Sequence, residues 1–309
     1  MSRIPDFFII GAPKCGTTSL AAWLADHPRV HMAHPKEPSF FDTDSPRVGV
    51  RRLDHYLRCF NGANDQHLAV GEASPNYLHS QVAVGAIREF NPSARVVVAL
   101  RDPVRMAPSL HAQLFYNQHE DLADFTAAWN AQERRRHGID LPQHCRLPQF
   151  LQYREACALG TQLARVYQFF GRDRVHVVLL DDIEADAQRE YQRILQFLGV
   201  PDDGRSQFAV YNAASARGDI RTWLPARNFG YLKQRLGVSH FSLRDWTHRP
   251  PVLPSANVMR ATLPPALRQE LVDAFAGEVQ LLESMLGRDL HSLWNRATTT
   301  PLTKEENVL

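Results

Sequence analysis

The sequence has few cysteines, no long apolar run and no large excess of charge of either sign. Its four cysteines show no C-x-x-C spacing, so we expect neither a disulfide framework nor a metal site. The apolar run at residues 7–10 stops at a glycine and is too short for a signal-peptide core or a membrane span. The formal net charge is +2, which gives no global attraction to nucleic acid or anionic membranes. These features predict a soluble cytoplasmic protein with no membrane span and no nucleic-acid partner.

The most informative stretch is FFIIGAPKCGTTS at residues 7–19. An apolar run ends at a glycine, a proline and a lysine follow, and a hydroxyl-rich cluster opens an amphipathic segment. This order predicts a strand, a tight turn and the start of a helix. The backbone amides of such a turn, the helix dipole and the charge of Lys14 favour a phosphate-like anion.

The same stretch differs in one respect from the loop of nucleoside triphosphatases, G-x-x-x-x-G-K-[ST]. Gly11 and Gly16 keep that spacing, but Thr17 stands where the lysine belongs, and the lysine lies earlier, at Lys14. The pattern indicates a related anion with different chemistry. The alternative is an ordinary strand, turn and helix with a surface lysine.

Strand and helix patterns alternate along most of the chain. Continuous apolar runs at residues 94–100 and 174–180 are typical of buried parallel strands, and a shorter strand is expected at residues 29–32. Helical patterns follow at residues 81–90, 121–136, 152–170, 185–198 and 265–286. The alternation predicts an α/β protein, a P-loop-like three-layer α/β/α fold with a central parallel sheet. We expect a single domain over residues 1–309, with a frayed tail at 295–309.

A second candidate anion site follows the strand at residues 94–100. Arg101 comes directly after that strand, at the edge where open α/β sheets bind ligands, and Ser109 lies in the helical segment that follows. Arginine offers two parallel donors to a phosphate. The alternative is a structural ion pair between Arg101 and Asp102.

Four segments in this order carry a family resemblance: FFIIGAPKCGTTSL, KEPSFFD, GEASPNYL and VVVALRDPVRMAPS. Together they resemble the sulfotransferases that use 3′-phosphoadenosine-5′-phosphosulfate (PAPS), and most of all the heparan sulfate branch and its bacterial relatives. The resemblance implies PAPS as the co-substrate, with no metal. It assigns Arg101 and Ser109 to the 3′-phosphate and, more weakly, Arg217 to a later donor loop. It assigns the 5′-phosphosulfate to Lys14, Cys15, Gly16, Thr17, Thr18 and Ser19.

The resemblance also implies how the reaction proceeds. Sulfuryl transfer resembles phosphoryl transfer, an in-line displacement with charge spread over equatorial oxygens. Lys14 would stabilise the leaving phosphate, and Glu37, which precedes a Phe-Phe-Asp run, would be the base that deprotonates the acceptor. His34 is the competing base. The acceptor is a hydroxyl or amine of a small molecule, lipid or carbohydrate, and the oligomeric state is not predicted.

Several alternatives remain open from the sequence. Glycosaminoglycan-modifying relatives carry a lysine where this chain has Ala73, so heparan sulfate is not assumed as the acceptor. The preceding Glu72 either orients Lys14 or the acceptor or makes structural hydrogen bonds. A kinase or nucleotide hydrolase using ATP and magnesium is the main rival, because Asp181 and Asp182 follow an apolar run as a magnesium-binding aspartate does. A non-catalytic nucleotide-binding protein is the third possibility. The basic run at residues 134–136 is expected to be a solvated helix end.

Overall fold

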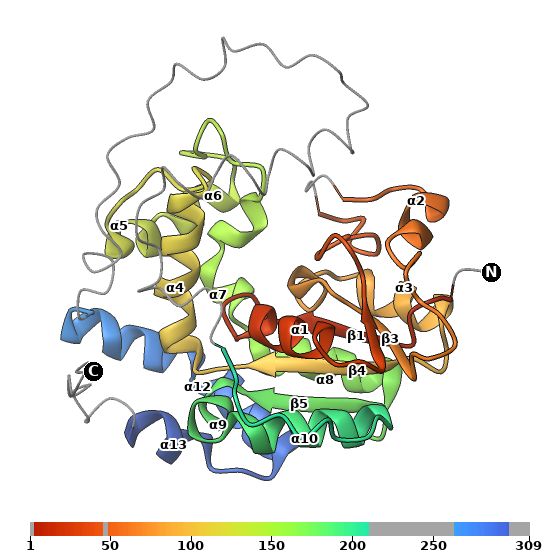
Figure 1. Ribbon diagram of the computed structural model, residues 1–309. Coiled ribbons are helices and arrows are strands. Elements are labelled where there is room, and N and C mark those ends of the chain that lie inside the picture. The colour runs from red at the N-terminus through yellow and green to blue at the C-terminus, as the bar shows by residue number, and fades with distance from the viewer. Residues whose placement is uncertain (1–2, 46–48, 210–262, 297–309) are drawn as a thin grey trace, which may run out of the picture.

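Five parallel strands in the order β2-β3-β1-β4-β5 form the central sheet of this computed structural model (Figure 1). The structure describes residues 3–45, 49–209 and 263–296. In chain order the elements are β1 (Phe7–Gly11), α1 (Thr17–Ala25), β2 (Val30–Met32), α2 (Leu53–Arg58), β3 (Ala69–Ala73), η1 (Pro75–Tyr77), α3 (Ala83–Phe90), β4 (Arg95–Leu100), α4 (Pro103–Tyr116), α5 (Phe125–Asn130), α6 (Gln132–Arg136), η2 (Pro148–Leu151), α7 (Tyr153–Ala156), α8 (Leu159–Phe170), β5 (Val175–Leu179), α9 (Leu180–Ala185), α10 (Ala187–Leu198), α12 (Pro265–Leu286) and α13 (Leu290–Arg296).

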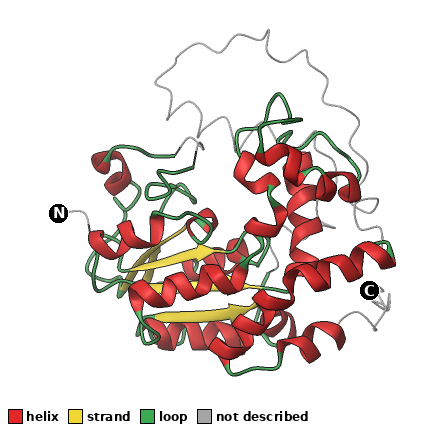
Figure 2. Cartoon of the chain, turned by 180° about the vertical axis from the view of Figure 1, so that it is seen from behind, coloured by secondary structure: helices red, strands yellow, loops and turns green. Residues whose placement is uncertain are grey.

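Helices cover both faces of the sheet (Figure 1 and Figure 2). On one face Phe208 links α1 and α10, because its ring packs against Trp23 and Tyr191 at centroid distances of 5.0 and 5.3 Å. On the other face α8 packs against β4 and β5, and α3 and α12 pack against α8. The three-layer α/β/α prediction and its parallel sheet are therefore confirmed.

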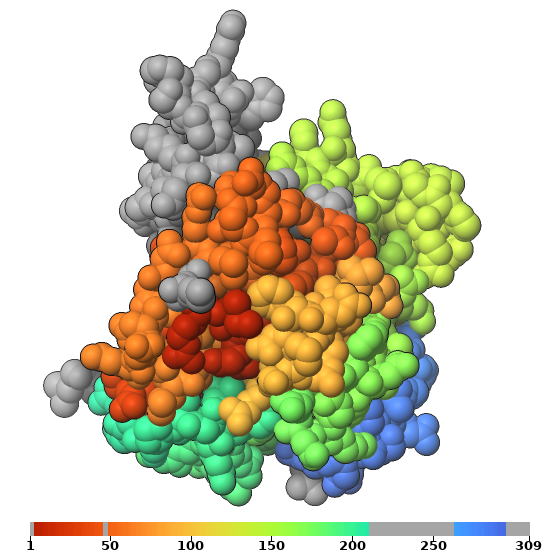
Figure 3. Space-filling view, turned by 90° about the vertical axis from the view of Figure 1, so that its right-hand side faces the viewer, coloured from red at the N-terminus to blue at the C-terminus, as the bar shows by residue number. Residues whose placement is uncertain are grey.

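The strand order places the candidate loops at one edge. The sheet grows in both directions from β1, with β3 on one side and β4 on the other. Because all the strands are parallel, the loops after β1, β3 and β4 lie together at the carboxyl edge of the sheet. The opposite edge is seen in Figure 3, where the start of the chain (red) lies at the surface among segments coloured orange.

Two helices that the sequence predicted as continuous are each broken. Within residues 121–136 the structure has α5 and α6. Asp124 precedes α5 and caps it, because its carboxylate accepts a hydrogen bond from the Ala127 amide. Residues 152–170 form α7 and α8. At that break the Gln162 side chain donates to the carbonyl oxygens of Glu155 and Ala156, which replaces helical partners that these carbonyls lose. The sequence has neither proline nor glycine at these positions to signal the breaks.

The basic run at the end of α6 is not fully solvated, so that prediction was wrong for Arg135. Its side chain is 1% exposed and forms two hydrogen bonds of 2.6 Å to the buried carboxylate of Glu120. The hydroxyl of Tyr153 donates to the same carboxylate at 2.7 Å. Burial raises the pKa of Glu120, but the Arg135 guanidinium, the Leu122 amide and this hydroxyl more than offset it, so the pKa lies below its ordinary value. The carboxylate is thus ionised at neutral pH and holds α6 and α7 to the end of α4.

We expect Arg135→Ala to lower the free energy of unfolding by about 3 kcal/mol, because it leaves the Glu120 charge buried without its main partner. Urea unfolding measures this change. Arg134→Ala is the matched control, since the Arg134–Asp140 pair is exposed and its removal should cost no more than about 0.5 kcal/mol. Equal losses in the two variants would contradict the buried-pair interpretation.

Candidate functional site

The loop between β1 and α1 has the backbone geometry of an anion cradle. Gly16 adopts a left-handed conformation with φ 85°, and a Cβ there would lie 3.2 Å from Leu180 Cδ1, so glycine suits both the conformation and the space. A Cβ on Gly11 would lie 2.4 Å from Leu78 Cβ, which explains the first glycine of the pattern. The helix α1 begins after Gly16, which has no side chain that could cap the helix start. The amides of its first turn are therefore suited to an anionic ligand.

Lys14 lies at the tip of this loop in a left-handed conformation, with φ 68°. Such a conformation is unfavourable for a residue with a Cβ and is often found at functional sites. Its backbone oxygen accepts a hydrogen bond of 3.0 Å from Arg101 Nη1. The two candidate anion motifs, which lie far apart in the sequence, are thereby in direct contact.

The Arg101 guanidinium is only partly satisfied within the protein. Its Nε is buried and has no hydrogen-bond partner among the described residues. A buried donor without a partner is costly unless a ligand satisfies it. The predicted alternative, a structural pair with Asp102, is not what the structure shows, because the Asp102 carboxylate accepts from the Val104 amide at 2.8 Å and caps α4.

The remaining predicted donor residues lie on the same two segments. Ser109 is partly buried within α4, and the hydroxyl-bearing Thr17, Thr18 and Ser19 open α1. A cysteine near a helix start can have a lowered pKa and a reactive thiolate. Burial instead raises the pKa of the Cys15 thiol to about 12, so this thiol stays protonated at neutral pH. Arg217 lies outside the described residues.

Glu37 lies in the loop that follows β2. It adopts a left-handed conformation with φ 62°, and Ser39, two residues later, has φ 50°. Lys36 Nζ lies 2.5 Å from Glu37 Oε1, and about a quarter of the Glu37 side chain is exposed, 26%. The competing base, His34, is exposed. A partly exposed carboxylate on a conformationally constrained loop could accept a proton from a bound acceptor.

The segment after Glu37 is fixed to β3 and η1 by hydrogen bonds. The Ser39 amide donates to Ser74 Oγ at 3.2 Å, and the Phe40 amide donates to the Tyr77 hydroxyl at 2.7 Å. Behind these hydroxyls lies Glu72, which is fully buried on β3, and burial raises its pKa to about 8. Ala73, where the family resemblance implies a lysine, is also buried.

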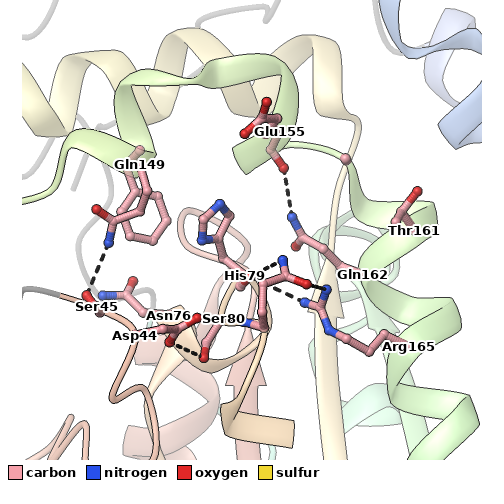
Figure 4. A pocket seen from close by; sticks show the side chains of 13 residues that line it. Asp44, Ser45, Asn76, His79, Ser80, Gln149, Glu155, Thr161, Gln162 and Arg165 are labelled. Atoms are coloured by element: carbon pink, nitrogen blue, oxygen red, sulfur yellow. Dashed lines mark hydrogen bonds between the residues drawn. The ribbon is translucent and has the colours of Figure 1, made fainter. Parts of the chain in front are cut away.

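A polar pocket of about 420 Å³ opens between the end of the Glu37 loop, η1 and the start of α8 (Figure 4). Many of its side chains are held by one another, as in the 3.1 Å bond from Gln149 Nε2 to Ser45 Oγ and the 2.6 Å bond from Ser80 Oγ to Asp44. The rings of His79 and Phe150 pack at a centroid distance of 4.8 Å. Burial and then Arg165 lower the pKa of His79, which leaves the imidazole neutral at pH 7. The pocket therefore offers a ligand neutral hydrogen-bonding groups, an aromatic surface and the charged side chains of Asp44, Glu155 and Arg165.

The two aspartates that suggested magnesium binding are used in protein contacts. Asp182 forms hydrogen bonds of 2.5 and 3.0 Å with the Arg288 guanidinium, and Asp181 accepts from Trp294 Nε1 at 3.1 Å. Arg105 lies 3.8 Å from the Asp181 carboxylate. These contacts fasten the last helices of the chain to α9, and the kinase alternative is not favoured.

Sequence reasoning did not find the hydroxyls that hold the Glu37 loop. Ser74 and Tyr77 belong to no pattern with an obvious chemistry, and their partners lie 35 and 37 residues earlier. One signal was present, because Glu72 is a single carboxyl within an otherwise apolar strand sequence, AVGEA. Such a residue must be hydrogen-bonded when it is buried.

Comparison with known proteins identifies a family whose model matches most of this chain. The family model of the sulfotransferase domain matches residues 4–214. In the part of the chain that the structure describes, no helix is long and apolar enough to cross a membrane.

Individual relatives are similar over parts of their length. Human carbohydrate sulfotransferase 15 is 25% identical over 274 residues, which cover 69% of this chain and 47% of that protein. Mouse heparan sulfate glucosamine 3-O-sulfotransferase 6 is 34% identical over 111 residues, covering 36% of this chain and 31% of that protein. The chain thus spans about half the length, or less, of these curated relatives. A crystal structure of a sulfotransferase from Alicyclobacillus acidocaldarius is similar over 94% of this chain and 98% of its own, with a TM-score of 0.70 and 26% identity.

Proposed function

This chain belongs to the sulfotransferase domain family, and we propose that it transfers a sulfuryl group from PAPS to a hydroxyl or amine of a carbohydrate acceptor. The observation that carries the donor assignment is the hydrogen bond from Arg101 Nη1 to the Lys14 backbone oxygen. This bond brings the two candidate anion-binding motifs together. PAPS carries phosphate groups at its 3′ and 5′ positions, so it needs two such motifs within reach of one molecule. The main alternative from the sequence, transfer from ATP with magnesium, lacks this support because Asp181 and Asp182 are engaged elsewhere.

The residues at the site suit this donor. The amides at the start of α1 and the Lys14 ammonium would hold the phosphosulfate. Arg101 Nε, which has no hydrogen-bond partner among the described residues, is a donor for the 3′-phosphate. We assign Ser109, Thr17, Thr18 and Ser19 to hydroxyl contacts with the same molecule. Arg217 stays a prediction.

The protein's part in the reaction falls to two side chains. Glu37 would take the proton of the acceptor as the new bond to sulfur forms. Lys14 would stabilise the negative charge that develops on the leaving phosphate, where a fixed cation lowers the barrier most. Both residues adopt left-handed conformations, which persist only where the surrounding structure enforces them.

Calorimetric titration with 3′-phosphoadenosine-5′-phosphate, the desulfated donor product, tests the donor assignment. We expect tight binding without magnesium, and much weaker binding of ATP under the same conditions. Preference for ATP, or binding of neither nucleotide, would overturn the proposed function.

Arg101→Ala should weaken binding of the desulfated product by about 2–3 kcal/mol, which is about 30- to 150-fold, because a charged contact to phosphate is lost. The same titration measures this change. Arg88→Ala is a suitable control, since Arg88 lies on α3 and contacts the Phe170 ring. An unchanged affinity in Arg101→Ala would remove this residue from the donor site.

A carbohydrate acceptor is supported by the relatives, several of which are named as carbohydrate or heparan sulfate sulfotransferases. The pocket beside the Glu37 loop adds support, because amides, hydroxyls and the paired His79 and Phe150 rings suit the hydroxyls and ring faces of a sugar. N-desulfated heparan sulfate offers both amines and hydroxyls, so labelled transfer to it, compared with transfer to lipid and small alcohols, tests this choice. Labelling only of the non-carbohydrate acceptors would contradict it.

The cytoplasmic location stays a prediction, which cell fractionation would test.

A further inference from the structure

We propose that Glu72 is a positioning residue for sulfuryl transfer, and that it holds the Glu37 loop through two hydrogen-bond relays. The inference rests on the proposed function, in which Glu37 is the base. The Glu72 carboxyl is buried, and it accepts hydrogen bonds from the hydroxyls of Tyr56 and Ser74.

The first relay runs through Ser74. The Ser39 amide donates to Ser74 Oγ at 3.2 Å, and Ser74 Oγ donates to Glu72 Oε2 at 3.3 Å. Because the hydroxyl already accepts from the amide, its own proton is directed to a carboxyl oxygen of Glu72. Ser39 lies two residues after Glu37.

The second relay runs through Tyr77. Its hydroxyl accepts from the amides of Phe40 and Phe41 at 2.7 and 3.3 Å, and hydrogen bonding from the Tyr77 side chain is one of the effects that lower the pKa of Glu72. A third hydroxyl, that of Tyr56, donates to Glu72 Oε1 at 3.0 Å. Three hydroxyls therefore converge on one carboxyl group, and two of them carry the backbone amides of the loop.

Aromatic packing isolates this network from water. The Phe40 ring stacks on Tyr56 at 4.5 Å, and Phe41 packs edge-on against Tyr56 and Tyr77 at 5.4 and 5.8 Å. The other titratable groups that act on Glu72 are the buried carboxyl of Asp42 and the thiol of Cys59. No positively charged group is among the causes that shift its pKa. The hydroxyls have no competing solvent, so their orientation depends on the acceptor oxygens of Glu72.

The loop needs this support because its backbone is unfavourable. Left-handed conformations at Glu37 and Ser39 flank Pro38, and each costs of the order of 1 kcal/mol or more unless the surroundings enforce it. The two relays fix the amides immediately after these positions. Without the hydrogen-bond acceptor Glu72 the loop would be released, and the Glu37 carboxylate would move away from the position in which it can act as a base.

Glu72→Gln tests the inference at about pH 9, where a carboxyl with a pKa of about 8 is ionised. Glutamine keeps the shape of that carboxylate, but its amide group donates where a hydroxyl also donates. In hydrogen exchange we expect the amides of residues 39–41 to exchange about tenfold faster, while α12 keeps its protection. We expect kcat for transfer to N-desulfated heparan sulfate to fall about tenfold or more, with unchanged affinity for the desulfated donor product. Glu120→Gln is the control, because it perturbs another buried carboxyl and should lower stability without lowering kcat.

A double variant separates positioning from general loss of stability. If Glu72 acts through Glu37, then Glu37→Gln combined with Glu72→Gln should have the same kcat as Glu37→Gln alone. Multiplied losses, unchanged exchange at residues 39–41, or normal kcat in Glu72→Gln would each overturn the inference. Different results would contradict the proposed function itself. These are an unmodified protein that binds no desulfated donor product, or a Glu37→Gln variant that retains full transfer.

Discussion

Glu37→Gln should lower kcat by about 10²- to 10⁴-fold, the usual contribution of a well-placed general base. Glutamine has nearly the same shape as glutamate, but it cannot take a proton from the acceptor. The donor site lies on other segments, so the affinity for the desulfated product should stay within about twofold. Steady-state kinetics of labelled transfer, together with calorimetry, measures both effects.

The matched control for this prediction is His34→Ala. His34 lies three positions earlier in the same loop and is exposed, so its loss should leave kcat nearly unchanged. The reverse pattern, in which Glu37→Gln is active and His34→Ala is not, would transfer the role of base to the histidine. A non-catalytic nucleotide-binding protein would show no transfer at all, and Glu37→Gln would change its stability alone.

Lys14→Ala should lower kcat by about 10²- to 10³-fold, as expected when one fixed group that stabilises transition-state charge is removed. The structure makes this test unusually specific, because Arg101 contacts the backbone oxygen of Lys14 and not its side chain. Truncating the side chain therefore removes the ammonium group and leaves the link between the two anion motifs.

Arg105→Ala is the control for Lys14→Ala, since it removes another positive charge close to Arg101. Arg105 lies on α4, 3.8 Å from the Asp181 carboxylate, and has no proposed part in the reaction. If both variants lost activity equally, the effect would reflect general positive charge around the site. Near-normal turnover in Lys14→Ala would exclude it from the reaction.

The parts of the site that the sequence predicted are those where local chemistry determines local structure. Glycines at fixed spacing require a tight turn, and an apolar run followed by an arginine places that arginine at the end of a buried strand. The first loop and Arg101 were expected to bind one ligand for this reason, and the structure brings them into contact. Their binding and catalytic roles remain predictions.

Features that depend on distant partners could not be predicted. Arg135 stands in a run of three arginines, and only the fold brings Glu120 and Tyr153 to its guanidinium. The break between α7 and α8 depends on the Gln162 side chain reaching carbonyls of the preceding turn. Glu72 was recognised as ambiguous, and the hydroxyls of Ser74 and Tyr77, which resolve the ambiguity, come from tertiary packing.

The contacts of the last helices bear on how this chain folds during its synthesis. The sulfotransferase match ends at residue 214, yet α12 lies over α8, where Glu278 accepts from the Thr161 amide and hydroxyl at 2.7 Å. Arg288 and Trp294 then hold the aspartates of α9, beside the loop that carries Lys14. A ribosome-bound chain that has emerged only to residue 214 therefore still exposes the outer face of α8. The contacts to Asp181 and Asp182 form only when residues 288–294 have emerged as well.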